Sequence, residues 1–317
     1  MKHQILALAV AALSFTACSN EDNISQDYLA DTPIKLNVSV DEPTTRAGYS
    51  ETVLPEGFGL FVTQDQENVN SKYNYQVYVK KDGDSWKTYK LNENYGGTDE
   101  EVTMLWANMN DKVKVTAFTK FGEITIPTDQ TSDEQLKQAD VLYMTPTMID
   151  PSKEGIKVDL QHAMSKINLT IELGSEYEFS KEDVDLKITD VKIDGSLVSA
   201  TVYANGIYDD FGVPTPIFPF HTGTTPYSKT GGVITKASAT YEAILIPQYI
   251  ESGNFTVSFK VDGKLYEWAY NQELTLNPNT AYTLKLIAGN DKVQPVSFSV
   301  AAWGVGNGTD GEKKETD

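Results

Sequence analysis

Apolar and polar residues alternate along most of the chain, and this pattern predicts an almost entirely β protein. The first such segment alternates as a strand with one buried face does, and its apolar residues are Ile34, Leu36, Val38 and Val40. Further strands are predicted in segments 57–62, 73–79, 113–117, 156–160, 167–173, 184–193, 255–261, 282–286 and 296–300. A one-residue slip in phase between Ile188 and Val191 predicts a β-bulge.

Turn residues separate the predicted strands, and only one short helix is expected. Asp262-Gly263 lies between two strand runs, as in a tight hairpin. Ser132 and Gln135 have capping-box spacing and predict a helix that ends near Ala139. Because strands and helices do not alternate, the pattern favours β-sandwiches over a Rossmann or α/β-barrel fold.

The first residues are organised like a signal peptide. Lys2 precedes an apolar run, residues 5–13, which is too short to span a bilayer. Thr16-Ala17-Cys18 resembles a bacterial lipobox, so we expect loss of residues 1–17 and acylation of Cys18 with fatty acids such as palmitate. An ordinary cleaved signal peptide with an incidental cysteine is the alternative. The acidic residues just behind Cys18 resemble a surface-export tag of Bacteroidetes lipoproteins, or form a simple polar tether.

Size and charge restrict the class of partner. A chain of 317 residues, 40% of them hydrophobic, suits two domains with cores of their own. Its 45 acidic and 26 basic residues give a net charge of −19, which repels phosphate backbones, so no nucleic-acid partner is expected. Cys18 is the only cysteine, so the mature chain can form no internal disulfide.

We expect the domain boundary near residue 160, where a charged, glycine-containing segment gives way to a new series of strands. The expected segments are 1–17 (signal peptide), 18–46 (tether and first strand), 47–160 (N-terminal β-sandwich domain), 161–307 (C-terminal β-sandwich domain) and 308–317 (disordered tail).

The sequence offers no residues for catalysis. Histidine occurs only at positions 3, 162 and 221, so no histidine cluster is available for zinc. Gly96-Gly97 lacks the downstream Lys-Ser/Thr pair of a phosphate-binding loop. We therefore expect a protein that is not an enzyme and that needs neither a metal nor a cofactor.

Isolated polar and aromatic residues are interpreted as structural. His162 is expected to be a hydrogen-bonded structural residue rather than a ligand or base. Three of the four tryptophans are expected to anchor the core rather than to stack on sugars, namely Trp106, Trp268 and Trp303.

Several short motifs, taken in their order along the chain, resemble the fimbrillin family, the type V pilins of Bacteroidales. The most telling segment runs from Leu160 to Ile167, with the sequence LQHAMSKI. The other similar pieces are Thr45-Arg46-Ala47, Leu105-Trp106 ahead of 113–118, Asp140–Tyr143, Ala243–Gln248 and a terminal strand that closes on Trp303-Gly304. The resemblance covers nearly the whole chain.

Membership in this family implies two transthyretin-like β-sandwich domains in series and a particular route of assembly. A lipoprotein precursor reaches the cell surface, where an arginine-specific protease would cut between Arg46 and Ala47. The first strand, residues 34–40, would then leave its groove. A neighbour's C-terminal strand would fill the groove, and its apolar residues here are Val296, Phe298, Val300 and Ala302.

The resemblance also implies the partners and the location. The partners would be other pilin subunits, the protease and the lipoprotein-processing machinery, and the precursor would touch the outer membrane only through its lipid. The mature protein would form part of a surface fimbria that contributes to adhesion. A tip or accessory adhesin of the same pilus is one alternative. A surface glycan-binding lipoprotein is another, and it would array several aromatic residues on one exposed face.

Overall fold

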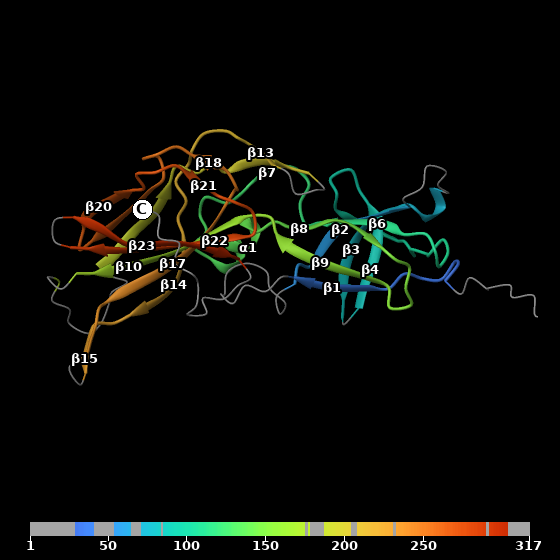
Figure 1. Cartoon of the computed structure of the whole chain (residues 1–317), viewed down its shortest axis with the longest axis horizontal. Coiled ribbons are helices and arrows are strands. Elements are labelled where there is room, and N and C mark those ends of the chain that lie inside the picture. The colour runs from blue at the N-terminus through green and yellow to red at the C-terminus, as the bar shows by residue number, and fades with distance from the viewer. Residues whose placement is uncertain are drawn as a thin grey trace, which may run out of the picture.

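The computed structural model describes residues 29–40, 54–64, 71–83, 85–174, 177, 187–203, 208–230, 233–289 and 292–303. Within them strands dominate and the one α-helix is short, so the predicted all-β class is confirmed (Figure 1). The leader, Cys18, Arg46, Ala47 and the tail 308–317 lie outside the described residues, as do Val184 and Leu186.

The first half of the chain forms an eight-stranded series with the order β1-β9-β8-β6-β2-β3-β4-β5. Its strands are β1 (Leu36–Val40), β2 (Gly57–Gln64), β3 (Tyr75–Asp82), β4 (Ser85–Leu91), β5 (Gly97–Glu101), β6 (Val113–Phe118), β8 (Leu142–Ile149) and β9 (Ile156–His162). A 3₁₀ turn, η1 (Ser71–Tyr73), precedes β3. β8 pairs with β9 only at the last two residues of β9, His162 and Gln161. Therefore residues 156–160 of β9 have β1 as their only strand partner among the described residues.

The second half builds a five-stranded sheet of order β14-β17-β10-β22-β23 and several smaller sheets. The five strands are β14 (Phe220–Thr225), β17 (Ser238–Leu245), β10 (Ser165–Leu173), β22 (Thr280–Ala288) and β23 (Val293–Ala302). The smaller sheets are β11 (Ile188–Asp194), β19 (Thr256–Val261) and β20 (Lys264–Ala269); β13 (Tyr208–Phe211), β12 (Ser199–Val202) and β7 (Gly122–Thr125); β15 (Ser228–Thr230) with β16 (Val233–Thr235); and β18 (Tyr249–Ile250) with β21 (Leu274–Thr275).

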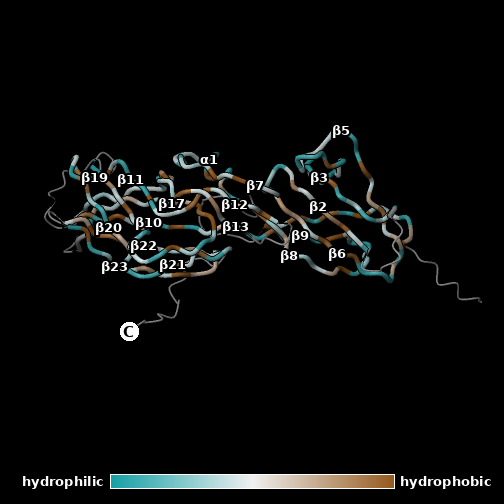
Figure 2. Tube along the Cα trace, turned by 90° about the horizontal axis from the view of Figure 1, so that it is seen from above, coloured by the Kyte–Doolittle hydropathy of each residue, from teal (hydrophilic) through white to brown (hydrophobic). Residues whose placement is uncertain are grey.

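Two hydrophobic cores follow one another along the long axis of the molecule (Figure 1). Leu160 is the last buried residue of the first core along the chain, and from Ala163 onward the buried apolar residues belong to the second core. Brown apolar and teal polar stretches alternate along the strands of both groups, as a sheet with one buried face requires (Figure 2). The segment 122–141 precedes the expected boundary, yet Ile126 and Leu136 pack in the second core. The domain boundary near residue 160 stays a prediction, and a single division at that position does not account for the packing of segment 122–141.

Three local expectations are confirmed by backbone geometry. Helix α1 (Asp133–Ala139) begins after Ser132, whose side chain accepts the Gln135 N–H as a cap should. The β11–β19 register shifts between Thr189 and Lys192, which is the predicted bulge. Asp262 and Gly263 have φ values of 49° and 83° and turn β19 into β20, because a tight hairpin needs left-handed residues at its centre.

Candidate functional site

The N-terminal segment, residues 29–40, is inserted into the first core. Val40 is 1% exposed and Leu29 is 3% exposed. The half-buried apolar side chains that pack against the same core are Ile34, Leu36 and Val38. The structure therefore brings all four apolar residues predicted for the first strand onto one core-facing side.

Backbone hydrogen bonds hold this segment on two sides. β1 runs parallel to β9, from Leu36 opposite Ile156 to Val40 opposite Leu160. Before β1 begins, Ile34 N donates to Met104 O at 2.9 Å. Asp31 N and Trp106 N complete the second side with bonds of 2.9 and 3.0 Å to Trp106 O and Thr32 O. Residues 29–40 are thus hydrogen-bonded to β9 and to residues 104–106. No helix or strand precedes them in the described part of the chain.

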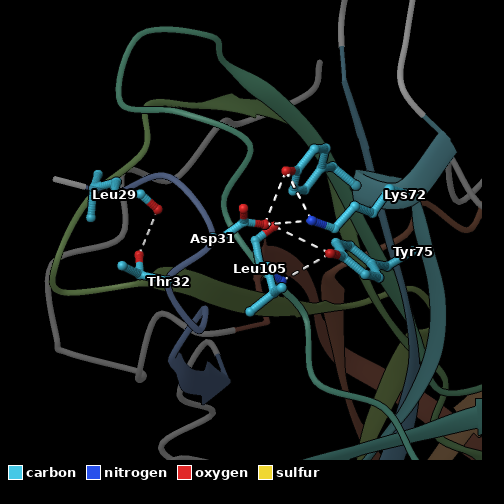
Figure 3. A network of polar contacts seen from close by, with 7 residues as sticks. Leu29, Asp31, Thr32, Lys72, Tyr75 and Leu105 are labelled. Carbon is cyan, nitrogen blue, oxygen red and sulfur yellow. Dashed lines mark hydrogen bonds and ion pairs between the residues drawn. The ribbon is translucent and has the colours of Figure 1, made fainter. Parts of the chain in front are cut away.

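A polar network fastens the start of the segment (Figure 3). Lys72 Nζ lies 2.6 Å from Asp31 Oδ1, and the Tyr73 hydroxyl donates to the same oxygen at 3.0 Å. The Lys72 hydrogen bond, with help from that of Tyr73, lowers the pKa of Asp31. Because Lys72 and Asp31 are both more than half exposed, these contacts position the segment and contribute little stability.

The backbones of the two segments approach each other closely where the pairing of β1 with β9 begins. Gly155 has a φ of +87°, and a Cβ built there would lie 2.2 Å from Lys35 O. The adjacent Ile156 N donates to that same oxygen at 2.8 Å. Only glycine fits this position, since a side chain would occupy the space of the bonded carbonyl and the backbone is left-handed.

Side chains of β1 add two contacts to the β9 region. Ser39 Oγ donates to Asp159 Oδ1, and Asn37 Nδ2 donates to Glu154 O at 2.9 Å. Burial alone would raise the pKa of Asp159, but hydrogen bonds from Ser39 and Lys157 outweigh it and lower the pKa. Asp159 is therefore bound more firmly to β1 as a carboxylate than as an acid.

This contact makes the attachment of β1 sensitive to acid. A lowered folded-state pKa stabilises the protein above the usual value of 3.8, and the gain disappears as the pH falls through the folded-state pKa. We expect the thermal unfolding midpoint to fall more steeply below pH 3.8 in the wild type than in Ser39→Ala. Asn37→Ala, which loses only a bond to a backbone carbonyl, should parallel the wild type. Equal slopes in wild type and Ser39→Ala would contradict the assignment.

The C-terminal strand, β23, lies at the edge of its sheet and exposes most of its apolar residues. Among the described strands it pairs with β22 alone, from Val293 opposite Ala288 to Ala302 opposite Thr280. Val296 is 49% exposed, Val300 is 57% exposed, and Ala302 is also exposed. Phe298 is half-buried, with its ring 4.9 Å from that of Tyr270. The ten residues of β23 carry no charge, which is unusual at the open edge of a sheet in so acidic a chain.

Beyond β23, a buried polar cluster surrounds Trp303. His162 Nδ1 lies 3.0 Å from Asp140 Oδ1, and both side chains are fully buried. Lys166 Nζ lies 3.2 Å from Glu242 Oε1, with the lysine 1% exposed. The structural interpretation of His162 is thereby confirmed, as is the core position of Trp106 and Trp303, whereas Trp268 is half-buried. Sequence reasoning missed Lys166 and Glu242, because each lies on the polar face of an alternating strand.

No group of three or more histidine, cysteine or acidic side chains in the described ranges is placed to hold a metal ion. Among the helices described, none has the length and apolar character needed to cross a membrane. A shallow pocket of about 510 Å³ lies beside β18, lined by Tyr249, Glu251 and Asn254 among others.

Comparison with known proteins places the fold. A family model described as fimbrillin-like matches residues 45–303. A candidate cell adhesion protein from Bacteroides ovatus aligns with a TM-score of 0.59 at 14% identity, covering 86% of this chain and 98% of that one. At this identity the likeness shows a shared fold alone. No curated protein matches the sequence.

Two further solved structures align over a similar length. A fimbrial protein from Bacteroides vulgatus has a TM-score of 0.47 at 14% identity, covering 86% of this chain and 99% of that one. The C-terminally truncated tip fimbrial protein Mfa3 from Porphyromonas gingivalis has a TM-score of 0.48 at 9% identity, covering 86% of this chain and 100% of that one. Since the family model matches more than half of its residues, the chain belongs to the fimbrillin-like family, and this membership supports the role of a fimbrial subunit at the cell surface.

Proposed function

We propose that this chain is a structural subunit of a fimbria that polymerises by β-strand donation after proteolysis. An arginine-specific protease cuts between Arg46 and Ala47, and the N-terminal segment leaves as a plug. A neighbouring subunit then inserts its β23 into the vacant slot. The observation that carries the proposal is the position of β1, which is the only strand partner of residues 156–160 in the described chain.

The energetics of the slot support this route. Removal of β1 leaves the polar backbone groups of residues 156–160 without their strand partner, which is costly wherever water cannot replace it. It also uncovers core residues such as Ile156 and Val158, both 0% exposed. Burial of one large apolar side chain is worth about 1.5–3 kcal/mol. A replacement strand that restores several such contacts would make a durable joint between subunits.

The proposed donor matches the plug in its pattern. Both strands carry apolar residues at four alternate positions, 34–40 in the plug and 296–302 in the donor. In the donor, Val296 and Val300 are about half exposed, so they lose little burial when they leave and gain it in a slot. The absence of charge on β23 suits an apolar slot for the same reason.

Export and anchoring belong to the same proposal. The precursor is acylated on Cys18 by the lipoprotein-processing machinery and carried to the outer surface of the outer membrane. The cut at Arg46 separates the fimbrial part from this lipid. Arg46 is the only arginine in the sequence, so an arginine-specific protease has one site in the whole chain.

That single arginine permits a clean test. Purified precursor treated with an arginine-specific protease should acquire Ala47 as its N-terminus and form a ladder of oligomers, as followed by mass spectrometry and size-exclusion chromatography. The Arg46→Lys variant keeps the charge but removes the site, so it should stay uncut and monomeric. We expect at least a tenfold difference in the oligomeric fraction between the two.

The donor is tested in the same assay. Val300→Asp should be cut normally and should fail to assemble, because a charge would enter an apolar slot. Val213→Asp is the matched control, since Val213 is 73% exposed and lies outside β23. Cut wild-type protein that stays monomeric, or Val300→Asp that assembles like the control, would refute strand donation.

Two other functions are distinguished by simple measurements. A tip or accessory adhesin would cap the oligomers, so the cut protein would add to a fibre end without forming a ladder. A glycan-binding protein has one specific observation in its favour, because Tyr249 is 54% exposed beside Glu251 and Asn254 in the shallow pocket. Saturable retardation of the monomer in a polysaccharide gel, lost in Tyr249→Ala, would favour that class.

A further inference from the structure

The last residue described, Trp303, is enclosed although the strand before it is an exposed edge. Trp303 is 2% exposed, whereas Val300 is 57% exposed. The ladder pairs Lys166 with Ala281 and Ala281 with Ala301, so Lys166 and Ala301 share one face of the sheet. Trp303, two residues beyond Ala301, points to that same face, opposite to the face of Phe298, Val300 and Ala302.

Three contacts form the seat of the Trp303 ring. The His162 ring stacks on it with centroids 4.1 Å apart and an interplanar angle of 1°. Lys166 Nζ lies 5.9 Å from the indole centroid, within the range of a cation–π interaction. The backbone N–H of Trp303 donates to Asn279 O at 2.9 Å.

Buried partners hold the residues of the seat in place. Asp140 lies 3.0 Å from the His162 ring nitrogen Nδ1. Glu242 lies 3.2 Å from Lys166 Nζ. Asn279 N donates to Met164 O at 3.0 Å, an ordinary hydrogen-bond length. The seat is therefore built by the framework of the second core, and β23 contributes only the ring that enters it.

We propose that Trp303 is a latch that keeps β23 on its own subunit, and that the strand cannot leave β22 until the ring has left its seat. The use of this latch rests on the proposed function, because only a donor strand needs to be released. The seat includes His162, the last residue of β9, which is the strand that also binds the plug. β1 and the tryptophan that follows β23 thus both contact β9.

The character of the seat suits release as well as retention. Among the described residues Trp303 Nε1 is buried and has no hydrogen-bond partner. Stacking and the cation–π contact hold the ring. When the ring leaves the seat, its indole N–H can form a hydrogen bond with water that it lacks while buried. The latch therefore delays the opening of β23 without making it irreversible.

Hydrogen–deuterium exchange of uncut protein tests the latch apart from assembly. In an Arg46→Lys background, Trp303→Ala should speed exchange of the amides of β23 by about tenfold while the central strand β10 keeps its protection. Trp86→Ala is the matched control, a partly buried tryptophan that packs on Phe58 in the first core. It should leave β23 unchanged.

The outcomes separate the latch from the proposed function. Unchanged exchange of β23 in Trp303→Ala overturns the latch. If that variant also loses protection in β10, Trp303→Leu decides, since leucine fills part of the seat but can neither stack on His162 nor make the cation–π contact with Lys166: faster exchange confined to β23 supports the latch, and unchanged exchange overturns it. With Arg46 restored, Trp303→Ala should assemble several-fold faster after cleavage. Failure of cut wild-type protein to assemble refutes strand donation, whereas the exchange result stands independently.

Discussion

Replacement of Gly155 with alanine is expected to separate β1 from β9 and to lower the free energy of unfolding by about 2–4 kcal/mol. The new Cβ would lie 2.2 Å from the Lys35 carbonyl oxygen, so the bonded strand itself must shift. The left-handed backbone at this position, with a φ of +87°, adds strain. Urea unfolding gives the stability, and exchange of the amides of β1 gives the local loosening.

A matched glycine isolates the effect of the close approach. Gly253 has a φ of +83° and no atom within 4 Å of a built Cβ, so Gly253→Ala incurs the backbone strain alone. We expect it to cost about 1 kcal/mol and to leave the exchange of β1 unchanged. If the two variants lose equal stability, the contact with Lys35 is not a constraint on the strand. Gly155→Ala should also release the plug faster after cleavage, which links this position to assembly.

Removal of the Glu242 carboxylate should have a comparable effect on the second core. Glu242→Ala leaves the Lys166 ammonium, 1% exposed, without the acid 3.2 Å away. Burial already lowers the pKa of Lys166, and the Glu242 charge opposes that shift, so its loss lowers the pKa further. Breaking a buried pair from one side typically costs about 3–5 kcal/mol, measured here by urea unfolding.

Two comparisons test this explanation. Glu100→Ala removes an acid from an exposed pair with Lys90, both more than 60% exposed, and should cost less than about 1 kcal/mol. The double variant Lys166→Met, Glu242→Leu leaves no unpaired charge and should recover most of the stability. If Glu242→Ala proves as mild as Glu100→Ala, the ion pair does not support the seat of Trp303.

Local patterns were sufficient to predict many of the elements. Alternating residues at 34–40 predicted β1, and Ser132 with Gln135 predicted the start of α1. Both depend on neighbours within a few residues, where backbone geometry and side-chain caps act directly. β8 was missed as a strand pattern, since its residues from Thr145 onward are largely exposed and do not alternate clearly.

Pairing over long distances in the sequence could not be predicted in the same way. The parallel register of β1 with β9 joins residues about 120 positions apart, and the pattern of either strand would suit other partners equally well. The polar cluster around Trp303 has the same origin. Lys166 and Glu242 look like solvent-facing residues of two strands, and they are buried because distant parts of the chain, among them Trp303 over Lys166, cover that face.

The sequence by itself determined the all-β class, the apolar face of the first strand and, through the order of its motifs, the resemblance to fimbrillins. These properties arise from periodicity and short motifs, which each segment carries on its own. The tertiary structure decided that β1 pairs with β9 while residues 31–34 just before it bond to residues 104–106, that β23 is an exposed edge, and that Trp303 is enclosed by His162 and Lys166. The physical reason is that burial and strand pairing depend on which distant segments meet, and only the folded chain brings those segments together.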